Sequence, residues 1–127
     1  MRRDSTSLGV IVVWEHVTPS DRDVVLPAST VLARISDPRA VQFWDAHRAL
    51  SAAIVADLPA DTLASVAQIE STGVKIAWDS AALFRAGARW DDRFPVPDWA
   101  GRPIVETAET LRLRLRTLMR APAPAPR

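Results

Sequence analysis

The sequence predicts one α/β domain with a central mixed four-stranded sheet, in the order β-α-β-α-β-β-α, flanked by helices. Three observations predict this fold. Apolar runs rich in β-branched residues alternate with stretches of helical periodicity over 127 residues, a length that suits one domain. Hydrophobic residues make up 48% of the chain and charged residues 24%, as is ordinary for a globular domain. Each of the five tryptophans lies next to a carboxylate, so on a strand the ring can enter the core while the carboxylate faces the other side.

Two strands are predicted in the first third of the chain. Residues 8–14 form a continuous apolar run, Leu-Gly-Val-Ile-Val-Val-Trp, which is typical of a strand buried on both faces. Residues 29–34 favour a helical turn. A turn at residues 37–38 then leads into a second strand over residues 40–44.

Polar residues around the second strand are predicted to be structural. The segment Asp37-Pro38-Arg39 is expected to form an ion pair with Asp45 or Asp21 that locks the turn, rather than to bind an anion through Arg39. Gln42 lies in a strand whose neighbouring positions face the other way, so we expect it to cross-link backbone at a sheet edge.

A helix is predicted after the second strand. Asp45 ends that strand and fits the N-cap of a helix over residues 46–58. Leucine or isoleucine recurs at every fourth position from residue 50 to 58, which gives the helix one apolar stripe. Residues 61–69 are interpreted as a short helix or a surface excursion.

The third and fourth strands are predicted in the second half of the chain. Residues 74–84 favour a third strand with a kink at Asp79, followed by a turn at residues 86–87. A proline-rich loop over residues 94–101 leads to a short fourth strand at residues 103–106, whose proline suggests a sheet edge.

The last element is predicted to be a helix capped by Thr107. Leucine and arginine alternate over residues 111–116 with the period of a strand, but both are good helix formers and no β-branched residue is present, so a helix is favoured. The expected organisation is therefore a disordered arm at 1–7, the domain at 8–119 and a disordered Ala/Pro tail at 120–127.

Composition excludes several classes of chemistry. The chain has no cysteine, which excludes disulfide exchange, thiol catalysis and thiolate metal sites. Its net charge is +1, so no nucleic-acid partner is expected. The longest apolar run is far shorter than the ~20 residues of a spanning helix, so no membrane span is expected. We predict a cytoplasmic protein, with an exported form that lacks its signal segment as the alternative.

The order of elements over residues 8–118 resembles the thioredoxin-like fold. Four local motifs are similar to those of an uncharacterised bacterial group of thioredoxin-like proteins, and they lie at residues 12–15, 37–45, 77–79 and 87–90. Where thioredoxins carry Trp-Cys-x-x-Cys, this chain has Trp-Glu-His-Val-Thr, and it has no proline just before its third strand. The resemblance therefore implies a redox-inactive member of the group.

Such an arrangement brings polar side chains to the carboxyl ends of the parallel strands, where open α/β sheets bind ligands. The candidate catalytic residues are Glu15, His16, Asp45 and Asp79. The candidate metal ligands are His16, Asp45 and His47, because histidines with carboxylates suit zinc or iron. The alternative is that Asp45 is a helix cap and His16 an exposed turn residue.

Aromatic residues form the candidate binding surface. They are Trp14, Trp44 and Trp78 at the strand-end rim, with Arg89, Trp90 and Trp99 in and beside the following loop. Tryptophan and arginine together are typical of protein-binding hot spots. The alternative for this loop is a solvated segment with Trp90 folded onto the core.

Three functions remain open. The favoured one is a binding or accessory module that uses one of these tryptophan surfaces, without a cofactor, and that has a protein partner or a second copy as its ligand. The second is a small metal-dependent or acid/base enzyme that uses the carboxylate and histidine cluster. The third is a structural subunit that forms a homodimer through the strand at residues 103–106.

Overall fold

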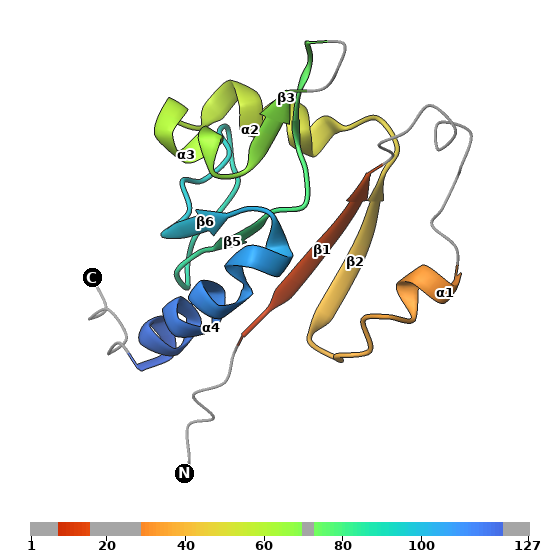
Figure 1. The fold of residues 1–127 in the computed structure, drawn as a ribbon, viewed down its shortest axis with the longest axis vertical. Helices are drawn as coiled ribbons and strands as arrows, with labels where there is room; N and C mark the ends of the chain where they lie inside the picture. Colours follow the sequence, from red (N-terminus) through yellow and green to blue (C-terminus); the bar gives the residue numbers. More distant parts are fainter. Residues whose placement is uncertain (1–7, 16–28, 70–72, 121–127) are drawn as a thin grey trace. The chain divides into compact units, whose positions relative to one another are not determined.

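The described residues of the chain form six strands and four helices (Figure 1). The computed structural model describes residues 8–15, 29–69 and 73–120. These residues divide between two compact units, Met1–Leu50 and Ser51–Arg127, and each unit is described by itself.

The first unit is built on two parallel strands, β1 (Val10–Glu15) and β2 (Ala40–Asp45). They pair over their whole length, and Figure 1 shows them side by side with α1 (Ser29–Leu32) ahead of β2. The predicted parallel pairing of the first two strands is confirmed.

The predicted burial of β1 on both faces is wrong. Ile11 is 72% exposed, and Val41 and Phe43 on β2 are each 54% exposed. The register places Ile11 beside Val41 and Val13 beside Phe43, so these side chains share one face of the two strands. Among the described strands β1 pairs with β2 alone, and no third strand extends this sheet.

Gln42 holds the other face of this pair together, as predicted. Its amide Nε2 donates to the carbonyl oxygen of Leu32 at 3.0 Å, and its Oε1 accepts a hydrogen bond from Trp14 Nε1 at 2.9 Å. One side chain therefore links β1, β2 and the end of α1.

The turn before β2 is closed by an ion pair within the predicted segment, between Arg39 and Asp37. Of the two expected partners, Asp45 instead accepts backbone N–H groups of α2, and Asp21 lies outside the described residues. Arg39 Nε donates to Asp37 Oδ1 at 2.9 Å, and Nη2 donates to Oδ2 at 2.5 Å. The Arg39 backbone N–H also donates to Asp37 Oδ1 at 2.9 Å. These hydrogen bonds from Arg39 lower the pKa of Asp37 to about 2.

Helix α2 (Ala49–Asp57) begins three residues later than predicted, but Asp45 caps it. Asp45 Oδ1 accepts the N–H of Ala49 at 2.9 Å, and Oδ2 accepts the N–H of Leu50 at 2.7 Å. Arg48 has a φ of 54°, so the chain turns through a left-handed residue before the helix starts. The side chain of Asp45 spans that turn.

The second unit has an apolar core. It is formed by α2, α3 (Ala60–Ala64) and the antiparallel strands β3 (Ala67–Ile69) and β4 (Lys75–Ala77). Its buried apolar side chains are Ile54, Leu58, Leu63, Val66 and Ile76. Ile76 is the most deeply buried, at 1% exposure. The interpretation of residues 61–69 as a short helix is partly confirmed, because α3 ends at Ala64 and residues 67–69 form strand β3.

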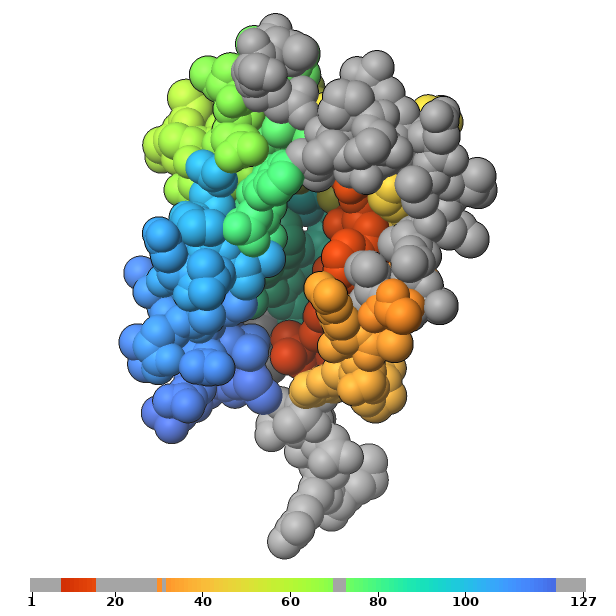
Figure 2. Space-filling view, turned by 45° about the vertical axis from the view of Figure 1, so that its right-hand side comes forward, coloured from red at the N-terminus to blue at the C-terminus, as the bar shows by residue number. Residues whose placement is uncertain are grey.

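A second antiparallel pair, β5 (Ala81–Leu83) and β6 (Trp99–Gly101), packs against the last helix, α4 (Ile104–Arg120). Gly101 is needed here, because a Cβ at this position would lie 2.7 Å from Cζ2 of the Trp99 ring. Figure 2 shows the blue atoms of α4 exposed at the surface.

The predicted four-stranded, thioredoxin-like sheet is wrong. The described strands form three separate two-stranded sheets, β1-β2, β3-β4 and β5-β6. The expected third strand over residues 74–84 is divided into β4 and β5, which pair with different partners. Asp79, between them, has a φ of 45°, so the predicted kink is a left-handed residue that separates two sheets.

The predicted fourth strand at residues 103–106 is also wrong. Pro103 immediately precedes α4, where its missing N–H costs nothing and its carbonyl oxygen accepts the N–H of Thr107 at 3.1 Å. Thr107 lies inside the helix and not at its cap, and its Oγ1 donates to the same carbonyl at 2.9 Å. The helix predicted for residues 111–116 is confirmed, and it extends to Arg120, one residue into the expected tail. The other tail residues and the arm at 1–7 lie outside the described residues.

Candidate functional site

The two Trp-carboxylate pairs of the first unit end side by side. Trp14 lies beside Trp44, and Glu15 beside Asp45, because the two strands are parallel and in register. These four residues therefore lie at one end of one sheet, as predicted, but Trp78 and Asp79 follow β4 in a different sheet, so their predicted place at the same sheet end is wrong. Both oxygens of Asp45 accept N–H groups at the start of α2, which confirms its predicted alternative role as a helix cap.

Among the described residues, no histidine is grouped with the carboxylates of this rim to form a metal site. His47 is exposed in the turn after Asp45, and His16 lies outside the described residues. Within residues 8–15, 29–69 and 73–120, no three His, Asp or Glu side chains are placed to hold a metal ion. The metal and acid/base assignments stay predictions.

The tryptophan rings at this rim are half-buried. Trp14 donates its indole N–H to Gln42. The indole Nε1 of Trp44 is buried and has no hydrogen-bond partner among the described residues. These rings therefore contribute to the packing of the first unit more than to a free surface.

In the second unit, Asp79 and Trp78 follow β4. Asp79 Oδ1 accepts the N–H of Ile104 at 3.3 Å, at the first residue of α4. The Trp78 backbone N–H donates to the carbonyl of Val66 at 3.2 Å. Asp79 thus satisfies a backbone donor at a helix start, which is a structural role.

The connection from β5 to β6, residues 84–98, has no regular secondary structure and is named here the Trp90 loop. Its two ends are hydrogen-bonded to each other. The Asp98 N–H donates to the carbonyl of Leu83 at 2.8 Å, and Asp98 Oδ2 accepts the N–H of Arg85 at 2.9 Å. The Arg85 guanidinium lies 2.6 Å from the other carboxylate oxygen of Asp98.

The middle of the Trp90 loop is attached to α2. Asp57 Oδ2 accepts the N–H of Phe94 at 2.7 Å, and its Oδ1 lies 4.0 Å from the guanidinium of Arg93. The predicted turn at residues 86–87 is also found, with Gly87 at a φ of 89°. The loop is therefore long, irregular and anchored at several points, which is typical of loops that carry function.

Three aromatic rings lie along this loop. Phe94 packs edge-to-face on Phe84, with ring centroids 5.9 Å apart, and on Trp90, with centroids 5.2 Å apart. Trp90 is nevertheless 51% exposed. One edge of the ring contacts Phe94 while about half of the side chain is exposed to solvent. The hot-spot role of Trp90 stays a prediction.

Charged side chains surround Trp90 without excess of either sign. The guanidinium of Arg89 is highly exposed and lies 3.8 Å from the carboxylate of Asp91. Arg93, on the other side of Trp90, is also highly exposed. The ring of Trp99 differs, since it packs against Gly101 in β6.

The sequence does not predict the contacts that hold this loop. Asp57 lies in α2, and neither its carboxylate nor the rings of Phe84 and Phe94 are among the candidate site residues. The one sequence feature that indicates an aromatic cluster is the recurrence of aromatic residues at 84, 90 and 94. This recurrence does not reveal that Asp57, 37 residues before Phe94, accepts the Phe94 backbone N–H.

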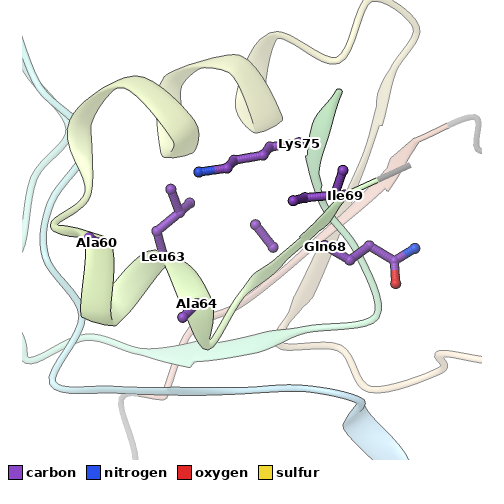
Figure 3. Close-up of a pocket in the computed structure, with 7 residues that line it drawn as sticks. Ala60, Leu63, Ala64, Gln68, Ile69 and Lys75 are labelled. Carbon is purple, nitrogen blue, oxygen red and sulfur yellow. The ribbon is translucent and has the colours of Figure 1, made fainter. Parts of the chain in front are cut away.

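A shallow hollow of about 230 Å³ lies between α3 and the strands β3 and β4 (Figure 3). Its lining is Ala60, Leu63, Ala64, Ala67, Gln68, Ile69 and Lys75. Figure 3 shows the Lys75 side chain extending toward Leu63 while the Gln68 side chain points away. The hollow is smaller than the roughly 300–1,000 Å³ of most small-molecule sites, and Lys75 is the one charged residue among the described residues that line it.

Comparisons with known proteins add no relative. The chain matches no protein-family model, no curated protein and no solved structure. Among the described residues, no helix is both long and apolar enough to cross a membrane. The similarity of four short motifs to an uncharacterised bacterial group stays a prediction, without the fold that it implied.

Proposed function

We propose that this chain is a protein-binding module that contacts its partner through the Trp90 loop. The observation that carries the proposal is the half-exposed ring of Trp90, which packs against the ring of Phe94. Phe94 is in turn fixed, because its backbone N–H donates to Asp57 at 2.7 Å. A large amphipathic ring is thus presented to solvent in a defined orientation.

Preorganisation favours this loop as a binding surface. Tryptophan and arginine are the residues most enriched among binding hot spots, and Trp90 has an exposed arginine on either side. Binding normally costs free energy to order loops and side chains. The anchors at Asp57 and Asp98 reduce that cost, because they hold the loop before a partner arrives.

The charges of the loop indicate the kind of partner. Arg85, Arg89 and Arg93 are matched in number by Asp91, Asp92 and Asp98. A surface without net charge does not attract a strongly charged ligand over distance. We therefore expect a partner surface with an apolar pocket for the indole and mixed polar groups at its edge, and an affinity that depends weakly on salt.

The strand-end rim supports this function less well. Trp14 and Trp44 are half-buried, and the carboxylate of Asp45 caps α2 with both of its oxygens. The hollow beside Lys75 lacks the several convergent polar groups that small-molecule sites use.

A displayed library of random peptides, selected on the full-length chain, tests the proposal. We expect the selected peptides to bind the Trp90→Ala variant about 30-fold or more weakly, since hot-spot truncation costs about 2 kcal/mol or more. Ile69→Ala is the matched control, because Ile69 is an exposed apolar side chain of the same unit, at 66% exposure. Its binding should be unchanged.

A second variant tests the role of the anchor. Asp57→Ala removes the acceptor for the Phe94 N–H and leaves Trp90 in place. Binding should weaken while the circular dichroism of the folded chain is retained. Selected peptides that bind wild type, Trp90→Ala and Ile69→Ala equally would contradict the proposal.

A further inference from the structure

The last eleven residues of α4 concentrate positive charge. Residues 110–120, named here the basic half of α4, contain four arginines and no acidic residue, whereas the whole chain has a net charge of only +1. The two acidic residues of the helix, Glu106 and Glu109, both lie before this segment. Charge is therefore polarised along the helix, with Glu109 paired to Arg112, the first of the four arginines, at 3.0 Å.

The basic half of α4 also has an apolar stripe. Leu111, Leu115 and Leu118 recur at intervals of four and three residues, so they lie on one face of the helix. At about 100° per residue, Arg112 and Arg114 fall on opposite sides of this stripe. The other two arginines, Arg116 and Arg120, continue the row that begins at Arg112.

The described residues cover this stripe only in part. Helix α4 has 17 residues and is about 25 Å long, whereas the three-residue strands β5 and β6 on which it packs are each about 10 Å long. No residue of α4 is fully buried, and the leucines of the stripe are only half-buried. In Figure 1 the dark blue last turns of α4 lie away from the β5 and β6 arrows.

We propose that the basic half of α4 lies flat on the anionic surface of a lipid bilayer. The leucine stripe would enter the boundary between headgroups and acyl chains, and the arginines on both sides would contact lipid phosphates. The proposal rests on charge complementarity and is independent of the function assigned to the Trp90 loop.

A bilayer fits this helix better than a nucleic acid or an acidic protein. Nucleic acid binding uses the arginines but gives the leucine stripe no apolar contact. An acidic groove in a protein contacts one face of a helix, whereas a flat surface contacts a stripe together with the charges on both of its sides. Arg112 and Arg114 occupy those two sides.

Sedimentation of the full-length protein with vesicles tests the proposal. We expect binding to vesicles of phosphatidylcholine with phosphatidylserine, no binding to phosphatidylcholine alone, and weaker binding as salt rises. The variant with Arg114→Gln and Arg116→Gln should bind about 25-fold more weakly, because each basic residue near an anionic surface contributes about fivefold. Glutamine is a comparable helix former, so α4 should persist in this variant.

A charge-matched control separates the basic half of α4 from general attraction. Arg34→Gln with Lys75→Gln removes two positive charges elsewhere, from exposed residues without an ion pair among the described residues. We expect binding close to wild type. Equal weakening of both double variants, or no dependence on phosphatidylserine, would overturn the proposal. The proposal would also be overturned if RNA or polyglutamate released the protein from vesicles at a concentration below that of the lipid phosphate.

The orientation of the helix can be tested because the chain has no cysteine. Single variants Met119→Cys and Thr117→Cys place an environment-sensitive fluorophore on opposite sides of the helix, beside the leucine stripe and away from it. We expect a blue shift with anionic vesicles for the label at 119 and none for the label at 117. Equal shifts at both positions, or no shift at 119, would overturn the proposed orientation.

Discussion

Each of the two units of this chain is stabilised internally by a different kind of interaction. In the first unit, the described residues include no fully buried apolar side chain, and a polar side chain, Gln42, links the strands to α1. In the described part of the second unit, five apolar side chains are buried, and Ile76 is the least exposed of them. One unit depends on directed hydrogen bonds and strand pairing, and the other on exclusion of water.

The difference shows that hydrophobicity along the sequence is a poor guide to burial. The most apolar run of the chain supplies β1, where Ile11 is 72% exposed. The core of the second unit is instead formed by single side chains from short elements, such as Leu63 in α3 and Ile76 in β4. Burial depends on what packs against a segment, which its own composition does not specify.

The largest expected effect is in the apolar core. Ile76→Ala should reduce the free energy of unfolding of the second unit by about 2–5 kcal/mol, because it removes buried atoms and leaves a cavity. Ile69→Ala, on the paired strand but 66% exposed, should cost much less. Urea unfolding followed by circular dichroism measures both. Similar costs for the two variants would contradict the assignment of Ile76 to the core.

An intermediate effect is expected in the first unit. Gln42→Ala removes the partners of the Trp14 indole N–H and of the Leu32 carbonyl, and should cost about 1–3 kcal/mol. Hydrogen exchange of the backbone amides in β1 and β2 should accelerate, while those of β4 remain protected. Gln42→Glu is a useful comparison, because it keeps an acceptor for Trp14 and loses the donor to Leu32. Unchanged exchange in both variants would show that pairing alone holds the two strands.

The smallest effect is expected at the exposed ion pair. Hydrogen bonds from Arg39 hold the pKa of Asp37 at about 2, below its usual value of 3.8. Because the folded pKa is depressed, this pair stabilises the first unit fully above about pH 4, and the contribution is lost as pH falls toward 2. NMR titration of the Asp37 carboxyl carbon checks the value. Arg39→Gln should raise the pKa of Asp37, and an unchanged value would rule out Arg39 as its cause.

The candidate site was predictable from sequence only in part. The composition around Trp90, with arginines at 89 and 93, indicated a binding loop. The anchoring of that loop by Asp57 was not predictable, since it joins residues 37 positions apart. The sequence did predict that Glu15 and Asp45 lie side by side, because parallel strands in register end together, but not that Asp79 follows a strand of another sheet. That prediction did not reveal that Asp45 uses both oxygens to cap a helix.

What the sequence by itself determined is local. The cap at Asp45, the pair of Asp37 with Arg39, the turn at Gly87 and the helical state of residues 111–116 all depend on neighbours within about five positions. Only the tertiary structure decided which strands pair. In that structure the expected third strand is interrupted at Asp79, and the segment after Pro103 begins a helix. The physical reason is that short-range spacing fixes local hydrogen bonds directly, whereas strand pairing sums many small contributions from residues far apart in the chain.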